Sequence, residues 1–369
     1  MSRRLSTPPG AMTATGTAPS VQRDNPAPGY MKSLDGLRGL AAVIVVFSHL
    51  SSQTGILQFW FEDRGGQIGV MLFFCLSGFL MAHVYFGQQF HVGTLGSYAV
   101  NRCARVVPLF LLVVVGSYVC RLLWENAPVY PITSDNVIAH LTLRVATSVL
   151  WTIPVELKFY ALFPFIWIVH RISYAAGTAC AAALLVTYFS IENGAMPIMR
   201  LGHYFLLGIL CHAISSSLPR ARWQNMAWIA AAVALLLVFP FPLSLIRETQ
   251  MKIWWDPWIA AAIAGFMVSS TKSEVAMRVL GSAPARGAGQ ISYSLYLLHM
   301  PVIWSVSRFL SPTEQPVTFW VIALSFTFLT SFACFHLFER PAGRFIRRVG
   351  STAATSTSAL AALSRSRGL

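Results

Sequence analysis

Three side chains in one apolar segment, LDGLRGLAAVIVVFSHL at residues 34–50, are suited to acid–base chemistry. Arg38 and His49 are eleven residues apart, almost three helical turns, so they share one face of a helix and lie roughly 16 Å apart along its axis. Asp35 is one turn before Arg38 and is expected to pair with it. Placing a histidine deep in an apolar segment costs free energy, so its presence there indicates a function. Alternatively, Arg38 only extends to a membrane surface and His49 only bonds a neighbouring helix.

A second segment, WTIPVELKFYALFP at residues 151–164, contains a carboxylate about five residues from its start. Glu156 has Tyr160 one turn later on its own face, whereas Lys158 points elsewhere. We expect Glu156 to lie at the depth of His49, because the two segments run in opposite directions. A carboxylate that orients or charges an imidazole forms an acid–base unit. The alternative is that Glu156 only satisfies another buried polar group.

Two further motifs contribute cations and a second histidine. In NRCARVVP, Arg102 and Arg105 share a helix face where the third apolar segment is expected to begin, and two fixed guanidinium groups suit phosphates. Anchoring of the helix at the cytosolic surface is the alternative. In ISYSLYLLHMPVIW, His299 is expected to be a structural or substrate-contact residue, or part of an interhelical hydrogen-bond network without a chemical role. No pair of histidines has metal-ligand spacing, so no metal site is predicted.

The elements that position these residues are expected to be membrane-spanning helices. The chain is 55% hydrophobic and only 11% charged, whereas soluble domains contain about 25% charged residues. Because a span needs about 20 apolar residues, the sequence predicts an all-α integral membrane protein, a bundle of about ten transmembrane helices. We place them near 35–51, 67–86, 106–123, 151–169, 174–191, 198–214, 226–244, 255–271, 291–309 and 317–338.

The distribution of charge predicts the orientation. Nineteen of the 27 Lys and Arg residues fall in the tails and loops that the predicted spans place on the same side of the membrane as the N-terminus. Because cytosolic loops carry the excess of positive charge, this predicts that both termini are in the cytosol. The net charge of +14 is spread between apolar runs, so it does not indicate nucleic-acid binding. We predict a disordered cytosolic tail at 1–32, one transmembrane domain at 33–345 and a flexible basic cytosolic tail at 346–369.

Taken together, these stretches resemble the acyltransferase 3 family, membrane O-acyltransferases with about ten spans that modify cell-surface sugars. The first-span pattern Arg-x10-His is matched by Arg38 and His49, and the third-span Arg-x-x-Arg by Arg102 and Arg105. The resemblance runs in order from about residue 33 to 345 and rests on SLDGLRGLAAVIVVFSH, GVMLFFCLSGFLM, NRCARVVPLF, TIPVELKFYALFP, ISYSLYLLHMPV and FERPAGRF.

The resemblance implies acyl transfer from cytosolic acyl-CoA, with acetyl as the usual group, to a hydroxyl of a glycan or glycolipid. It implies a multi-pass protein of the bacterial inner membrane that contacts lipids and acyl-CoA, with no bound cofactor. His49 would be the general base or a transient acyl carrier, Arg38 would be essential, and Arg102 and Arg105 would meet the donor. Glu156 aligns with the acidic residue of the family, while Lys158 departs from the commoner glutamine or histidine.

Two other functions are compatible with buried His, Glu and Arg. A transporter of a lipid-linked sugar or a proton-coupled solute also needs such groups, although the sequence has no detectable inverted repeat. A scaffold for polysaccharide assembly would not need Arg38 and His49 on one face. Within the enzyme hypothesis, succinyl or a longer chain is an alternative to acetyl. The acceptor stays open among exopolysaccharide, lipopolysaccharide O-antigen and a secreted small glycoside.

Overall fold

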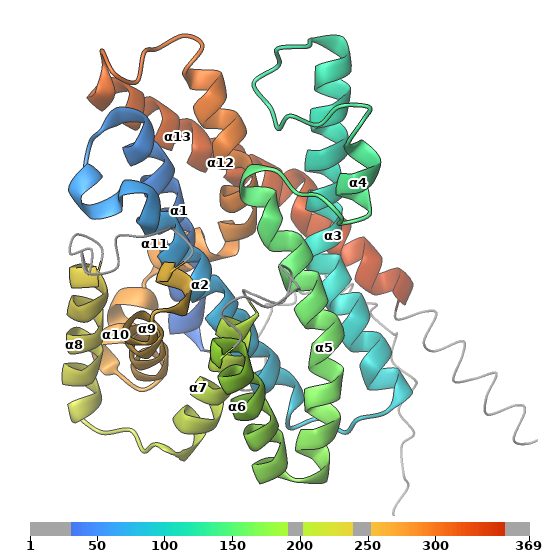
Figure 1. Ribbon diagram of the computed structural model, residues 1–369, viewed down its shortest axis with the longest axis vertical. Coiled ribbons are helices and arrows are strands. Elements are labelled where there is room, and N and C mark those ends of the chain that lie inside the picture. The colour runs from blue at the N-terminus through green and yellow to red at the C-terminus, as the bar shows by residue number, and fades with distance from the viewer. Residues whose placement is uncertain (1–30, 191–201, 239–251, 351–369) are drawn as a thin grey trace, which may run out of the picture. The chain divides into compact units, whose positions relative to one another are not determined.

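Every regular element in the part that the structure describes is a helix. A computed structural model describes residues 31–190, 202–238 and 252–350 (Figure 1). The chain divides into Met1–Met31 and a unit from Lys32 onward, which holds every described helix. The helices are α1 (Lys32–Thr54), α2 (Gln58–Tyr85), α3 (Val92–Leu123), α4 (Val137–Leu141), η1 (Ser148–Trp151), α5 (Thr152–Ile172), α6 (Tyr174–Ser190), α7 (His203–Ser217), α8 (Trp223–Val238), η3 (Lys252–Trp255), α9 (Pro257–Ser270), α10 (Glu274–Leu280), α11 (Ala283–Gln290), α12 (Ser292–Val306), α13 (Pro316–Cys334) and η4 (Phe335–Glu339).

Five of the described helical segments are long and apolar enough to cross a bilayer. Helices suit this environment because they satisfy their own backbone hydrogen bonds without water. The chain is therefore a membrane protein built from several apolar helices. The segments are Lys32–Thr54, Gly65–Tyr85, Val92–Leu123, Ser148–Ile172 and Pro316–Gly350.

These five agree with five of the ten predicted spans. The other five predictions fall on the shorter helices α6, α7, α8, α9 and α12. Residues 191, 198–201 and 239–244 of those predictions lie outside the described residues. The count of ten spans and the cytosolic side of both termini stay predictions. So do the two tails, of which 1–30 and 351–369 are outside the described residues.

The third helix begins earlier than predicted. We expected a start at 106, yet α3 begins at Val92, where His91 accepts from the Thr94 backbone N–H and the Thr94 hydroxyl accepts from the His91 backbone N–H. This reciprocal capping satisfies two backbone donors that a helix start otherwise leaves unpaired. Arg102 and Arg105 therefore lie about three turns inside α3 rather than at its first residues.

Helices α1 and α2 organise the bundle. Helix α1 packs against α2, α10, α11, α12 and α13, and α2 also packs against α5, α7 and α9 (Figure 1). At the α2–α7 crossing, a Cβ on Gly78 would lie 1.9 Å from the Phe205 carbonyl oxygen, and one on Gly208 would lie 1.9 Å from that of Cys75. Such small residues let two backbones touch, as is common between membrane helices.

One apolar core supports the two helices that carry the histidines. Its buried members come from α1, α12 and α13, with Ile291 just before α12, and they pack against one another along the C-terminal half of α1. Packing of this kind holds side chains in fixed rotamers. The members are Ala42, Val46, Leu50, Ile291, Leu295, Ile303, Phe319, Trp320 and Ala323.

Two prolines inside helices are compensated by tyrosines. Pro301 lacks the N–H that would bond the carbonyl of Leu297, four residues earlier, and the Tyr130 hydroxyl donates to that carbonyl at 2.8 Å instead. Likewise, Pro164 leaves the Tyr160 carbonyl without its helical donor, and the Tyr98 hydroxyl donates to it at 2.7 Å. The loop between α3 and α4 is thereby tied to α12, and α3 to α5.

We expect Tyr130→Phe to lower the free energy of unfolding by about 1–3 kcal/mol, because it leaves a buried carbonyl without a donor. Tyr130 is fully buried, and burial raises the pKa of its phenol well above the usual value, so the hydroxyl keeps its proton. The thermal unfolding midpoint in detergent measures the effect. Tyr118→Phe is the control, since Tyr118 is only partly buried. Equal midpoints for the two variants would contradict the prediction.

Candidate active site

The first of two neighbouring cavities contains the arginines. It measures about 60 Å³, lies between α1, α2, α3, α5 and α12, and has room for a few water molecules. Its polar wall combines three cations with one carboxylate and several hydroxyl groups. The lining residues are Arg38, Val70, Phe73, Phe74, Leu76, Ser77, Leu80, Arg102, Arg105, Val106, Thr152, Ile153, Glu156, Tyr160, Ser292, Tyr293 and Tyr296. The structure thus brings five of the predicted site residues, Arg38, Arg102, Arg105, Glu156 and Tyr160, into one place.

Arg102 is held by a cage of tyrosines. Its guanidinium carbon lies 5.4, 6.0 and 5.7 Å from the ring centroids of Tyr85, Tyr98 and Tyr160, and one of its nitrogens lies 3.4 Å from the Tyr85 hydroxyl. Cations are attracted to aromatic faces at such distances. Its buried Nε meets no hydrogen-bond acceptor among the described residues. The cage therefore fixes Arg102 and leaves a donor that an anionic or carbonyl ligand can satisfy.

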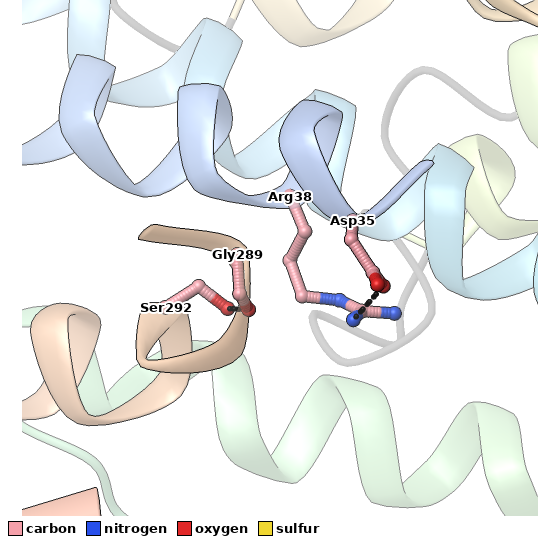
Figure 2. Close-up of polar contacts among 4 residues, drawn as sticks. All are labelled: Asp35, Arg38, Gly289 and Ser292. Atoms are coloured by element: carbon pink, nitrogen blue, oxygen red, sulfur yellow. Dashed lines mark hydrogen bonds and ion pairs between the residues drawn. The ribbon is translucent and has the colours of Figure 1, made fainter. Parts of the chain in front are cut away.

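Arg38 is oriented by the acid that the sequence suggested. Its guanidinium lies 3.4 Å from the Asp35 carboxylate, which confirms the predicted pair (Figure 2). Beside it, at the junction of α11 and α12, the Ser292 hydroxyl donates to the Gly289 carbonyl at 2.9 Å (Figure 2). Arg105 is close enough for its charge to act on Arg38. Two cations so placed repel each other unless an anion binds between them.

Glu156 bonds to hydroxyl groups of the first cavity. It accepts a very short hydrogen bond from Tyr160 and one from Ser77 at 3.3 Å. We expected it at the depth of His49, where it would orient the imidazole. The structure instead gives it hydroxyl partners and places it on the wall that also carries Arg102 and Arg105. The spacing within one helix was read correctly, since Tyr160 is its same-face partner.

The second cavity contains His49. It measures about 300 Å³ and is lined by Val45, Ser48, His49, Ser52, Gly66, Gln67, Val70, Ser148, Val149, Trp151 and Tyr296. Val70 and Tyr296 line both cavities, so they form the wall between them. The Tyr296 hydroxyl donates to the Val149 carbonyl at 2.9 Å, which fixes this wall. Cations thus lie on one side of a thin barrier and an imidazole on the other.

His49 is paired with the second histidine that the sequence singled out. Its Nδ1 lies 3.2 Å from Nε2 of His299 and 2.9 Å from the Val45 carbonyl oxygen. His299 is completely buried, and its own Nδ1 lies 3.1 Å from the Leu295 carbonyl oxygen. Because 250 residues separate the two histidines, no local pattern predicts this contact.

One further acidic residue near the arginines was not predicted. Glu339 is buried and accepts from the Ser294 hydroxyl at 2.6 Å. The charges of Arg105 and Arg38 act on it. It ends a π-helical turn, Phe335–Glu339, that continues α13. The one available signal was the acid in FERPAGRF, at the end of an apolar run, and π-turns often occur at functional sites.

The described residues offer a cradle for an anion rather than a metal centre. Within 31–190, 202–238 and 252–350, no group of three or more His, Cys, Asp or Glu side chains is placed to hold a metal ion. Three arginines with aromatic and acidic neighbours suit phosphates or a polarised carbonyl. The imidazole beyond the barrier suits proton transfer.

Comparisons with known proteins agree with this chemistry. The model of an acyltransferase domain matches residues 31–336. The peptidoglycan O-acetyltransferase OatA of Listeria monocytogenes is 21% identical over 356 residues, covering 85% of this chain and 56% of the relative. The O-acetyltransferase OatA of Staphylococcus aureus strain NCTC 8325 is 23% identical over 373 residues, covering 85% and 57%. A putative O-acetyltransferase of S. aureus strain MSSA476, SAS0844, is 24% identical over 356 residues with the same coverage.

The matches differ in how much of each protein they cover. The chain spans little more than half the length of the curated relatives it matches. No solved structure matches it. The family model, however, covers most of the chain and includes every residue of both cavities. The chain belongs to the acyltransferase 3 family of membrane acyltransferases.

Proposed function

We propose that this protein is a membrane O-acetyltransferase that moves an acetyl group from cytosolic acetyl-CoA to a hydroxyl of a cell-surface or exported glycan. The observation that carries the proposal is the pair of cavities on either side of Val70 and Tyr296, one with three arginines and one with His49. A donor with phosphates and an acceptor with a hydroxyl need such opposite environments. The relatives are named O-acetyltransferases, which supports the same reaction.

The proposed orientation places the arginine cavity toward the cytosol of a bacterium, in its inner membrane. Most Lys and Arg residues fall on that side in the predicted topology, as expected for cytoplasmic loops. CoA phosphates then meet Arg102 and Arg105, and Arg38 adds a third charge. Acetyl is the proposed cargo, because the matched relatives are named O-acetyltransferases.

The proposed chemistry needs one base and one electrophile. The acceptor oxygen attacks the thioester carbonyl carbon, His49 takes the proton of the hydroxyl, the C–S bond breaks, and CoA leaves as a thiolate that is then protonated. An imidazole with an unperturbed pKa of about 6.5 suits this task. His49 is either this base or a transient carrier that accepts the acetyl group before the acceptor does. In both cases it contacts reacting atoms.

Transport of a lipid-linked sugar or a proton-coupled solute is the alternative. Buried acids, arginines and histidines also serve proton relays. One observation favours acyl transfer over transport: the family model that matches the chain is that of an acyltransferase domain.

The deciding experiment uses membranes with and without the protein, acetyl-CoA labelled in its acetyl group, and a crude envelope glycan extract. We expect label on the glycan only when the protein is present, and its release by mild base, because esters hydrolyse where amides survive. Unlabelled CoA should compete. Absence of glycan label with folded protein and several acyl donors would refute the proposal and leave transport as the hypothesis to test.

A further inference from the structure

We infer that His299 is a positioning residue, which holds His49 in the single tautomer and orientation that leave Nε2 as its basic nitrogen. The inference rests on the proposed function, because it assigns a role within the same site. His299 lies outside the lining of either cavity, so it is not placed to touch the acceptor. Its contact is with His49, at 3.2 Å between Nε2 of His299 and Nδ1 of His49.

The proton positions follow from the two carbonyls. A carbonyl oxygen only accepts, so Nδ1 of His299, 3.1 Å from the Leu295 oxygen, carries a proton. A neutral imidazole has one N–H, so Nε2 of His299 is an acceptor. The nitrogen facing it, Nδ1 of His49, must then be the donor.

The second carbonyl gives the same answer independently. Nδ1 of His49 lies 2.9 Å from the Val45 oxygen, which again requires a proton on this nitrogen. That proton is shared between the Val45 oxygen and Nε2 of His299. The lone pair of His49 is thereby assigned to Nε2. A general base oriented by a third group in this way is the arrangement that activates nucleophiles in many enzymes.

The surroundings make His299 a rigid support. Leu295, whose carbonyl accepts a hydrogen bond from His299, and Ile303, one turn after His299, belong to the buried core of α1, α12 and α13. Pro301 leaves a carbonyl that Tyr130 bonds, so this stretch of α12 is fastened from the loop side as well. The two imidazole rings, with centroids 4.9 Å apart, can therefore hold one relative orientation.

Three substitutions separate this role from a structural one. The glutamine amide reaches about where Nε2 of histidine lies, and the asparagine amide about where Nδ1 lies. His299→Gln therefore keeps an oxygen acceptor for the His49 proton. His299→Asn keeps only a donor toward the Leu295 carbonyl, and His299→Leu keeps neither. If His299 merely anchors α12, Asn should serve at least as well as Gln.

The test measures acetyl transfer by the full-length protein against acetyl-CoA concentration, together with the unfolding midpoint. We expect kcat for His299→Gln within about tenfold of the unchanged protein, and about a 10²-fold loss for His299→Asn and His299→Leu. The KM for acetyl-CoA should stay within about twofold in all three variants, because the donor arginines line the other cavity. This pattern with matched unfolding midpoints supports the role.

Two results overturn the inference and are distinguishable. If His49→Ala abolishes transfer while His299→Asn and His299→Gln are equally active, the proposed function stands and the positioning role is wrong. If His49→Ala transfers acetyl at the normal rate, the proposed function again stands, but His49 is no catalytic residue and His299 has no base to position, so the inference is wrong.

Discussion

Replacement of His49 by alanine is expected to reduce acetyl transfer by about 10²–10⁴-fold, the usual contribution of a positioned general base. The ring lines the larger of the two cavities and is oriented by His299 and the Val45 carbonyl. Alanine supplies neither a base nor a nucleophile to carry acetyl, so the loss is expected under both proposed roles of His49. The rate of base-labile label transfer to glycan measures it.

A control must remove a histidine without touching either cavity. His91→Asn meets this need, because His91 is exposed and caps α3, and asparagine is also a preferred cap. We expect this variant to transfer acetyl at the normal rate. Binding of labelled acetyl-CoA should be unchanged in His49→Ala, because the three arginines of the first cavity are still present. A His49→Ala protein that transfers as fast as His91→Asn would exclude His49 from the reaction.

Relations within one helix were predictable from the sequence. Helical spacing gave the Asp35–Arg38 pair and the shared face of Glu156 and Tyr160, both of which the structure contains. The period of the α-helix fixes such contacts whatever the tertiary packing. For the same reason, Arg102 and Arg105 were placed together one turn apart.

Relations between helices were not predictable in this way. Depth in the membrane suggested that Glu156 would face His49, but depth does not fix the rotation of a helix about its axis. The contacts of α5 turn Glu156 toward Ser77 of α2, while α12 brings His299 to His49. Helix–helix packing, which depends on small residues and crossing angles, decides these rotations.

Two local departures from regular helix patterns were also missed. The start of α3 at Val92 was not predicted, because the stretch 92–105 contains polar and small residues that interrupt the apolar run. The π-helical turn at Phe335–Glu339 shifts the face on which Glu339 lies, so a strict α-helical period misplaces it. Both segments carry charged groups at or near the first cavity, Arg102 and Arg105 in one and Glu339 in the other.

Gly289→Ala is expected to lower the free energy of unfolding by about 1–3 kcal/mol or more, through overpacking at the crossing of α1 and α11. A Cβ at Gly289 would lie 1.9 Å from the Asp35 carbonyl oxygen. The obstacle is backbone, so it cannot rotate aside as a side chain would. The next residue of α1, Gly36, is already in backbone contact with α10, since a Cβ there would lie 1.8 Å from the Leu280 carbonyl oxygen. Helix α1 therefore has no room to move toward α10.

The same displacement should reach the chemistry, because Asp35 and Gly289 lie beside Arg38 (Figure 2). Moving the first turn of α1 changes the Asp35–Arg38 pair and the position of the Arg38 charge in the first cavity. We therefore expect a raised KM for acetyl-CoA in whatever Gly289→Ala protein folds. Gly287→Ala, two residues earlier in α11, is the matched control, since a Cβ there meets nothing within 4 Å. Alanine in that exposed helical position should stabilise the protein slightly, by about 0.5–1 kcal/mol. Equal unfolding midpoints and equal KM values for the two alanine variants would show that α1 and α11 are not in the backbone contact on which the position of Arg38 depends.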